Sequence, residues 1–139
     1  MRIFLDANIL VSVLNKEYPL FTYSSRLVSL MDNRKFEVFT SPICLAIAFY
    51  FSEKKSGALL ARRKMELLIS KIQIASVDAS TVTKTIKNKS ISDFEDGLEY
   101  YAAQAVKCQC IVTNDVDDFF FSSLEVLRPQ PFLEKYVMK

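Results

Sequence analysis

The chain has 139 residues, of which 50% are hydrophobic and 24% are charged, and its 18 basic and 16 acidic side chains give a formal net charge of +2. This length and this apolar content suit one compact domain over residues 1–139, and they exclude a chain that is disordered throughout. The sequence contains no histidine and only two glycines. These absences exclude Ser-His-Asp and Cys-His catalysis, histidine-ligated zinc and glycine-rich phosphate loops.

Short apolar runs alternate with stretches of helical periodicity from one end of the chain to the other. Strands are predicted at 2–5, 36–40, 72–77, 109–113 and 124–127. Helices are predicted at 8–15, 20–33, 41–56, 58–70, 79–88, 94–108 and 131–137, with Gly57 separating the third from the fourth and a helical turn at 117–121. Five strands that alternate with helices predict an α/β fold, a three-layer α/β/α sandwich around a five-stranded parallel sheet.

The apolar runs are too short for a membrane protein. The longest of them, residues 43–51, has nine residues, about half of the ~18 that a bilayer-spanning helix needs. Asp6 stands where a signal peptide would need apolar residues. We therefore expect a soluble, cytoplasmic protein without membrane contacts, whose three cysteines, Cys44, Cys108 and Cys110, are reduced and packed.

The charges are segregated along the sequence. Residues 54–89 carry nine basic side chains against two acids, whereas residues 90–126 carry eight acids against one lysine. Each segment is compatible with a solvated surface, and together they suit an enzyme whose acids hold a cation and whose bases contact phosphates. The candidate RNA contacts are Arg62, Arg63, Lys64, Lys84, Lys87 and Lys89.

Carboxylates follow two of the predicted strands. Asp6 ends the first strand, Asp115 comes just after the fourth, and Asp96 lies in the first turns of the helix that leads into the fourth. Taken singly, each is compatible with a helix cap or a turn. Because the carboxyl ends of parallel strands meet at one edge of a sheet, we expect the three to converge there. Oxygen ligands without histidine or cysteine favour Mg²⁺ or Mn²⁺.

Three segments, LDANIL (5–10), DFEDGL (93–98) and IVTNDVDDF (111–119), resemble the motifs of PIN-domain proteins, and among these the VapC-like toxins of bacteria. The resemblance extends over essentially the whole chain and implies a Mg²⁺-dependent (or Mn²⁺-dependent) endoribonuclease. It implies that Asp6, Asp96 and Asp115 are catalytic and bind the metal together with Asp118, and that Asn8 and Thr113 orient the site. It also implies three partners: RNA, a small antitoxin protein and a second copy of the chain.

One position departs from the family pattern. The family's second acid, a glutamate on the helix after the second strand, falls at Ile47 or its neighbour Ala46 in this sequence. Glu53 lies six residues beyond Ile47, about 9 Å along a helix, so it does not replace that acid in the same register. Asp93 and Glu99 are the candidate substitute acids.

Three functions remain open from the sequence. The first is a metal-dependent ribonuclease, including the toxin of a toxin–antitoxin pair. The second is a degenerate PIN domain that binds RNA or protein without catalysis, which Ile47 favours. The third is an aspartyl phosphatase of the haloacid-dehalogenase type, which is disfavoured because Asn8 occupies the place of its second aspartate.

Overall fold

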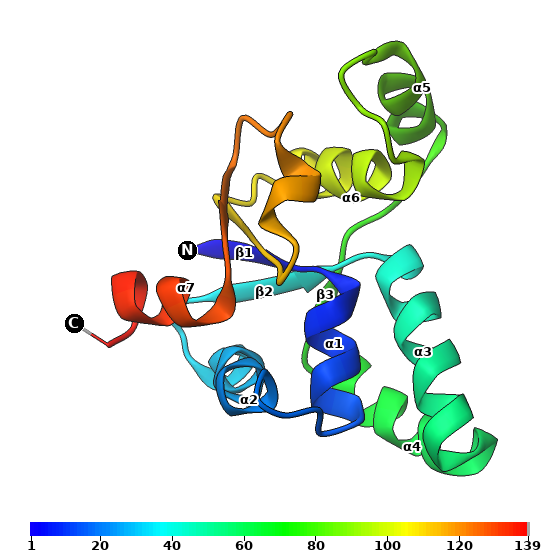
Figure 1. The fold of residues 1–139 in the computed structure, drawn as a ribbon, viewed down its shortest axis with the longest axis vertical. Coiled ribbons are helices and arrows are strands. Elements are labelled where there is room, and N and C mark those ends of the chain that lie inside the picture. The colour runs from blue at the N-terminus through cyan, green and yellow to red at the C-terminus, as the bar shows by residue number, and fades with distance from the viewer. Residues whose placement is uncertain (139) are drawn as a thin grey trace.

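The computed structural model describes residues 1–138, which form an α/β fold around a single sheet (Figure 1). All strand pairs are parallel, and the strand order is β3-β2-β1-β4-β5. The strands are β1 (Arg2–Leu5), β2 (Glu37–Thr40), β3 (Gln73–Ile74), β4 (Cys110–Val112) and β5 (Glu125–Leu127). The five-stranded parallel sheet that the sequence predicts is confirmed.

Helices cover both faces of this sheet, as the alternation of strands and helices requires. They are α1 (Ala7–Leu14), α2 (Phe21–Ser29), α3 (Pro42–Ser56), α4 (Ala58–Ile69), α5 (Ala79–Lys87), α6 (Phe94–Ala105) and α7 (Pro129–Tyr136), with short 3₁₀ turns at Leu30–Asp32 and Val116–Phe119. Figure 1 shows α5 and α6 on one side of the sheet and α1 to α4 on the other. Within residues 1–138, no helix is both long enough and apolar enough to cross a membrane.

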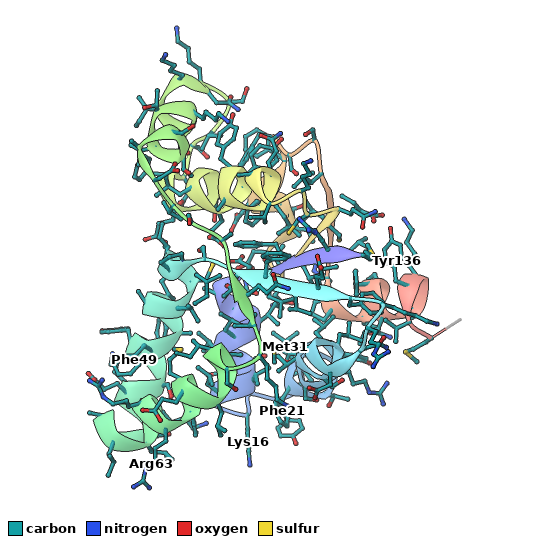
Figure 2. The ribbon with its side chains drawn as sticks, turned by 180° about the vertical axis from the view of Figure 1, so that it is seen from behind. Lys16, Phe21, Met31, Phe49, Arg63 and Tyr136 are labelled. Carbon is teal, nitrogen blue, oxygen red and sulfur yellow. The ribbon has the colours of Figure 1, made fainter. Side chains whose placement is uncertain are left out.

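The core lies between β1, β4 and the helices that flank them. Ile3, Phe4 and Leu5 in β1, and Ile111 and Val112 in β4, are fully buried, as expected for central strands covered on both faces. Side chains fill the space between the sheet and the helices (Figure 2). All three cysteines are buried and have free thiols, which confirms the prediction of reduced, packed cysteines.

Local signals explain where the site-bearing helices begin. Asp6 caps α1 and accepts a hydrogen bond from the Ala7 amide at 2.6 Å. Ser41 caps α3 by accepting from the Cys44 amide at 3.2 Å, and Pro42 occupies the first helical position. Asp93 caps α6. The first two caps lie where the chain leaves β1 and β2, whereas Asp93 lies between α5 and α6.

Several predicted boundaries differ from the structure. The predicted strand 72–77 shrinks to Gln73–Ile74, because β3 is an edge strand that pairs only with the end of β2. The predicted helix 94–108 ends at Ala105, where Lys107 adopts a left-handed φ of 60° and the Cys108 amide donates to the Ala103 carbonyl. That geometry is a normal helix termination. The predicted helix 20–33 divides into α2 and a 3₁₀ turn.

Candidate metal centre

A crevice of about 470 Å³ lies beyond the carboxyl ends of β1 and β4, where parallel α/β sheets commonly bind ligands. One wall is acidic and the other is apolar. The acids that line it are Asp6, Glu17, Glu95, Asp96, Glu99, Asp115 and Asp118, and no lysine or arginine among the described residues lines it. The structure therefore brings together the four acids that the sequence analysis assigned to a metal.

Asn8 and Thr113 connect the carboxylates at the ends of β1 and β4. The Thr113 hydroxyl donates to Asp6 Oδ2 at 2.8 Å and accepts from the Asp115 amide at 3.0 Å. The Asn8 side-chain amide lies 3.3 Å from Asp6 Oδ2 and 3.1 Å from Asp115 Oδ2, and Asn8 Oδ1 accepts from the Asn114 amide. These neutral groups hold two carboxylates in place without neutralising either charge.

Asp96 and Asp118 face the same crevice from α6 and from the turn after β4. Burial, followed by the carboxylates of Asp93, Asp6 and Asp118, raises the pKa of Asp96 to about 7. Desolvation and the nearby Asp115 carboxylate also raise the pKa of Asp118. Acids that resist ionisation because they face one another are the arrangement that a bound cation relieves.

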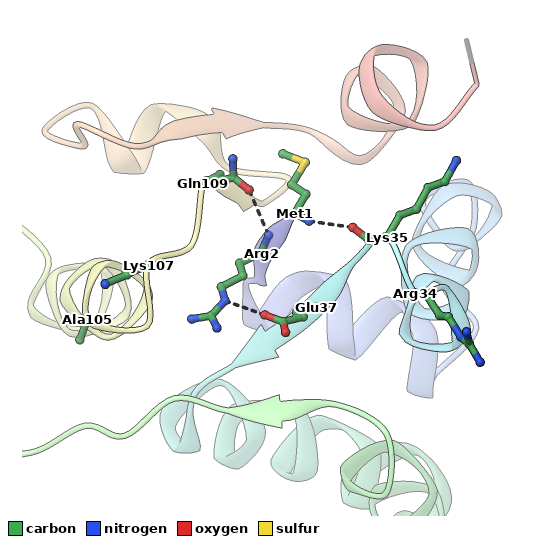
Figure 3. Close-up of a pocket in the computed structure, with 8 residues that line it drawn as sticks. All are labelled: Met1, Arg2, Arg34, Lys35, Glu37, Ala105, Lys107 and Gln109. Atoms are coloured by element: carbon green, nitrogen blue, oxygen red, sulfur yellow. Dashed lines mark hydrogen bonds and ion pairs between the residues drawn. The ribbon is translucent and has the colours of Figure 1, made fainter.

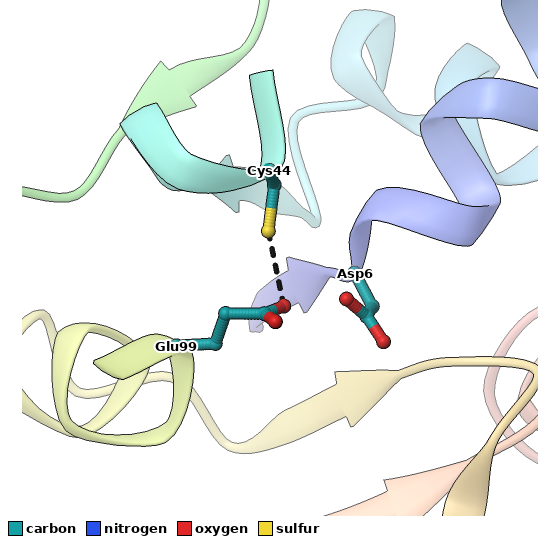
Figure 4. A group of neighbouring side chains, drawn as sticks. All are labelled: Asp6, Cys44 and Glu99. Atoms are coloured by element: carbon teal, nitrogen blue, oxygen red, sulfur yellow. Dashed lines mark hydrogen bonds between the residues drawn. The ribbon is translucent and has the colours of Figure 1, made fainter. Parts of the chain in front are cut away.

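Behind Asp6, the crevice ends in a buried group of three side chains from three elements (Figure 4). Asp6 directly follows β1, Cys44 lies in the first turn of α3, and Glu99 lies in the middle of α6. Their ligand atoms lie within 4.8 Å of one another. The Cys44 thiol donates to Glu99 Oε1 at 3.0 Å.

This group is almost completely shielded from solvent. The exposed fractions are 0% for Cys44, 2% for Glu99 and 7% for Asp6. Burial is the largest cause that raises the pKa of Glu99 well above its usual range, followed by the hydrogen bond with Asp6. Burial and the Asp6 charge likewise raise the pKa of the Cys44 thiol. Burial therefore disfavours the charged forms of Cys44 and Glu99 in this group.

The two candidate substitute acids differ in position. Glu99 lines the crevice and lies against Asp6, whereas Asp93 is exposed and accepts from the Asp96 amide at 3.2 Å as the cap of α6. Cys44 is a neighbour of the site acids that the sequence pattern does not predict. One feature of the sequence could have indicated it: Cys44 lies three residues before Ile47, and residues three apart on a helix share a face.

Ile47 lines the crevice, as the sequence analysis expected for the position of the missing acid. Its side chain is half-buried, and with Phe51 it forms the part of the α3 wall that faces the acids. Ala46 is exposed and lies outside the crevice lining, as does Glu53. Of the two positions at which the family's acid could fall, Ile47 therefore lines the crevice and Ala46 does not.

The candidate RNA contacts fall into two groups. Arg62, Arg63 and Lys64 belong to α4, whereas Lys84 and Lys87 belong to α5 and Lys89 follows it. Figure 1 shows α4 and α5 at opposite ends of the long axis, and Figure 2 shows Arg63 projecting from the α4 end. Five of the six are exposed, whereas the Lys64 ammonium donates to the Leu14 carbonyl at 2.8 Å.

A second pocket, of about 620 Å³, lies at the opposite, amino-terminal edge of the sheet (Figure 3). Arg2 forms an ion pair with Glu37 there at 2.6 Å, and the Met1 amino group donates to the Lys35 carbonyl at 2.7 Å. The side chains of Arg34 and Lys35 point away from this pair. The pocket therefore presents no converging set of ligands.

Comparison with known proteins identifies relatives of one kind. A family model described as "PIN domain" matches residues 2–117. Ribonuclease VapC1 of Aquifex aeolicus (strain VF5) is 24% identical over 138 residues, which cover 97% of this chain and 95% of the relative.

Solved structures with similar folds include two from toxin systems. One is the Rickettsia felis VapBC2 complex bound to a DNA fragment from its promoter, with a TM-score of 0.69 and 23% identity over 92% of this chain and 98% of that one. The other is Mycobacterium tuberculosis VapC20, described as a sarcin-ricin loop cleaving toxin, with a TM-score of 0.62 and 14% identity over 78% of this chain and 86% of that one.

Proposed function

The chain belongs to the PIN domain family, and from that membership we propose that it is a Mg²⁺- or Mn²⁺-dependent endoribonuclease that hydrolyses RNA phosphodiester bonds. One observation carries the proposal: acids from three separate chain segments converge in one crevice that has no basic lining residue in the part of the chain described. Such a set of oxygen donors fits a hard divalent cation.

Each residue of the crevice has a proposed part. Asp6, Asp96, Asp115 and Asp118 would hold the cation through their carboxylate oxygens. When bound, the cation would supply an activated water and would stabilise the charge that develops on the phosphoryl oxygens. Thr113 and Asn8 would keep Asp6 and Asp115 in position through the hydrogen bonds described above. Preorganised ligands lose little conformational freedom on binding.

Exposed basic residues that lie outside the crevice would bind the RNA phosphates on either side of the bond that is cleaved. Arg62 and Arg63 on one side, and Lys84, Lys87 and Lys89 on the other, are the proposed phosphate contacts. We give Lys64 a smaller part, because its ammonium already donates to the Leu14 carbonyl.

The relatives support a role in a toxin–antitoxin pair. The Aquifex relative is named a ribonuclease, and the Rickettsia structure is a VapBC complex. By this likeness, we propose a small antitoxin protein as a partner; the homodimer that we also propose rests on the resemblance of the sequence motifs to VapC-like toxins.

A second function, a degenerate PIN domain that binds RNA or protein without catalysis, is favoured by one specific observation. Ile47 places an apolar side chain on the α3 wall where the family pattern has a glutamate. A crevice with one carboxylate fewer attracts a divalent cation less strongly.

Cleavage and cation binding together separate these two functions. We expect the wild-type protein to bind Mn²⁺ in calorimetry and to cleave single-stranded RNA in Mg²⁺ or Mn²⁺. Asp6→Asn removes a charged ligand at the centre of the site and should lower cleavage about 100-fold or more.

Asp117→Asn is the matched control, because Asp117 lies in the same turn as Asp115 and Asp118 but does not line the crevice. Its cleavage and Mn²⁺ affinity should match those of the wild type. RNA binding without cleavage in either metal would replace the ribonuclease with the binding module, and equal loss in both variants would reject the crevice as the metal centre.

A further inference from the structure

The innermost part of the crevice differs chemically from the rest because it contains sulfur. Asp115, Asp118 and Asp96 offer only oxygen ligands and are at least partly exposed, whereas Asp6 and Glu99 are buried with the Cys44 thiol. Mg²⁺ requires octahedral oxygen coordination and retains several waters, so it gains nothing from a buried thiol. Zn²⁺ and its congeners bind thiolates together with carboxylates.

Glu99 lacks the partners that a buried carboxyl group normally has. Its side chain is 2% exposed. Within residues 1–138, its side-chain hydrogen-bond partner is the Cys44 thiol, and the Asp6 carboxyl group lies in the same group of three, within 4.8 Å. Figure 4 shows the Glu99 carboxyl group directed toward these two side chains. A buried carboxyl group that faces a second acid and no basic group is satisfied by protons or by a cation.

The spacing of the three ligands suits one small tetrahedral cation. Zn–S and Zn–O bonds of about 2.3 and 2.1 Å put two ligands of one zinc ion about 3.5 Å apart. Here Cys44 Sγ and Glu99 Oε1 are 3.0 Å apart, and all three ligand atoms lie within 4.8 Å of one another. Side-chain adjustments of less than about 1 Å would therefore complete the coordination. Asp6 and Glu99 also line the crevice, which gives a cation an entry path.

We propose that Asp6, Cys44 and Glu99 form a binding site for a thiophilic divalent cation of the Zn²⁺ class. On binding, the thiol S–H bond breaks, a metal–sulfur bond forms and the proton passes to solvent. The Asp6 and Glu99 carboxyl groups would bind as carboxylates, any proton on them would also pass to solvent, and no electron is transferred. Because Asp6 and Glu99 also line the crevice, a water molecule could reach a bound cation from that side.

This site goes beyond the proposed ribonuclease function, because its occupation requires no RNA. Asp6 belongs to both ligand sets, so one carboxylate cannot serve both cations without compromise. We therefore expect Zn²⁺ to inhibit Mg²⁺-supported cleavage wherever that cleavage is found.

Co²⁺ replaces Zn²⁺ as a spectroscopic probe, because a cobalt–thiolate bond produces a charge-transfer band in the near ultraviolet. We expect wild-type protein to bind one Co²⁺ with this band, Cys44→Ser to lose the band, and Glu99→Gln to bind Zn²⁺ more than about 10-fold more weakly. Cys108→Ser is the control, because Cys108 is also buried and free but lies outside the group, and it should retain the band. A band that persists in Cys44→Ser, or Co²⁺ binding without any band in the wild type, would overturn the proposal.

X-ray absorption of the zinc-loaded wild-type protein gives a test that does not depend on the folding of any variant. One sulfur neighbour at about 2.3 Å, with oxygen neighbours near 2.0–2.2 Å, is the expected first shell. A shell of oxygens alone would reject the site. RNA cleavage is measured separately, with protein that has been treated with a chelator and then supplied with Mg²⁺. Sulfur ligation of zinc without RNA cleavage would refute only the proposed ribonuclease function. RNA cleavage without sulfur ligation would refute only the proposed zinc site.

Discussion

The two walls of the crevice present opposite chemistry to the same space. β1, β4 and α6 supply Asp6, Asp115 and Asp96, whereas α3 supplies Ile47 and Phe51 and, deeper inside, the Cys44 thiol. The acidic wall matches the family motifs, and the α3 wall departs from them. The difference teaches that the carboxylates of the crevice come from the strand ends and from α6, whereas the residues of α3 that line it, Ile47 and Phe51, supply none.

The walls also differ in how their groups are held. Thr113 and Asn8 form direct hydrogen bonds to the carboxylates at the strand ends. On the opposite wall, Cys44 is the side chain of α3 that bonds to an acid, through Glu99. Hydrogen bonds therefore hold the carboxylates on one side of the crevice, whereas the other side is an apolar surface. Substitutions in one wall at a time can separate the two contributions.

The largest effect is expected from restoring an acid on the α3 wall. Ile47→Glu adds a carboxylate at a half-buried position that already lines the crevice. Each added carboxylate strengthens the field that holds a hard cation. We expect Mn²⁺ affinity to rise about 10-fold, with faster cleavage of single-stranded RNA.

Ala46→Glu serves as the matched control, since Ala46 precedes Ile47 on α3 but is exposed and outside the crevice lining. Calorimetry should find its Mn²⁺ affinity unchanged. An increase in Ala46→Glu with none in Ile47→Glu would mean that the register of α3 assigned here is wrong.

A smaller effect, on RNA binding, is expected from the exposed basic residues on α4 and α5, at the two ends of the molecule. Arg63→Ala on α4 and Lys87→Ala on α5 each remove one exposed cation. If RNA crosses the crevice between them, each change should weaken RNA binding about 2–5-fold at low salt and reduce the salt dependence by about one phosphate contact. Lys16→Ala, an exposed cation outside α4 and α5, is the control. A loss confined to one of the two ends would show that RNA follows only one wall.

The acidic wall should also make the metal-free protein sensitive to pH. Burial and neighbouring carboxylates raise the pKa of Asp96 from 3.8 to about 7. The folded protein therefore retains this proton at pH values where the unfolded chain has lost it, so the free energy of unfolding falls as pH rises between about 4 and 7. The melting temperature in a chelator should fall by about 3 °C or more across this window.

Asp96→Asn cannot ionise and should show a shallower fall over the same range, with Asp117→Asn behaving like the wild type. Added Mg²⁺ should oppose the fall in the wild type, because the cation favours ionised ligands. Identical slopes in Asp96→Asn and the wild type would place the origin of the pH dependence elsewhere.

The smallest effect is expected from relieving repulsion at an exposed ligand. Asp115→Asn removes one of the clustered charges while retaining an oxygen that accepts from Asn8. We expect the melting temperature without metal to rise by about 2 °C and the further gain from Mg²⁺ to shrink. Thermal scans with and without Mg²⁺ measure both. A clear loss of stability would instead identify Asp115 as a residue needed for the turn.

The strand-based part of this protein could be predicted from the sequence. Apolar runs such as 2–5 and 109–113 alternate with helices, and only a parallel sheet covered on both faces buries such runs. Because such strands end at a common edge, the convergence of Asp6 and Asp115 follows from topology alone. The helical spacing that places Ile47 on the crevice follows in the same way from the cap at Ser41 and Pro42.

Only the tertiary structure decided the depth of the site and the length of its elements. Cys44 and Glu99 are 55 residues apart in sequence, and their contact depends on how α3 and α6 pack, which local periodicity does not encode. The short β3 and the early end of α6 likewise depend on the edge pairing and on the left-handed Lys107. Burial converts Glu99 from a surface acid on a helix into a carboxyl group that requires a proton or a cation, because desolvation is a property of the assembled fold rather than of the residue.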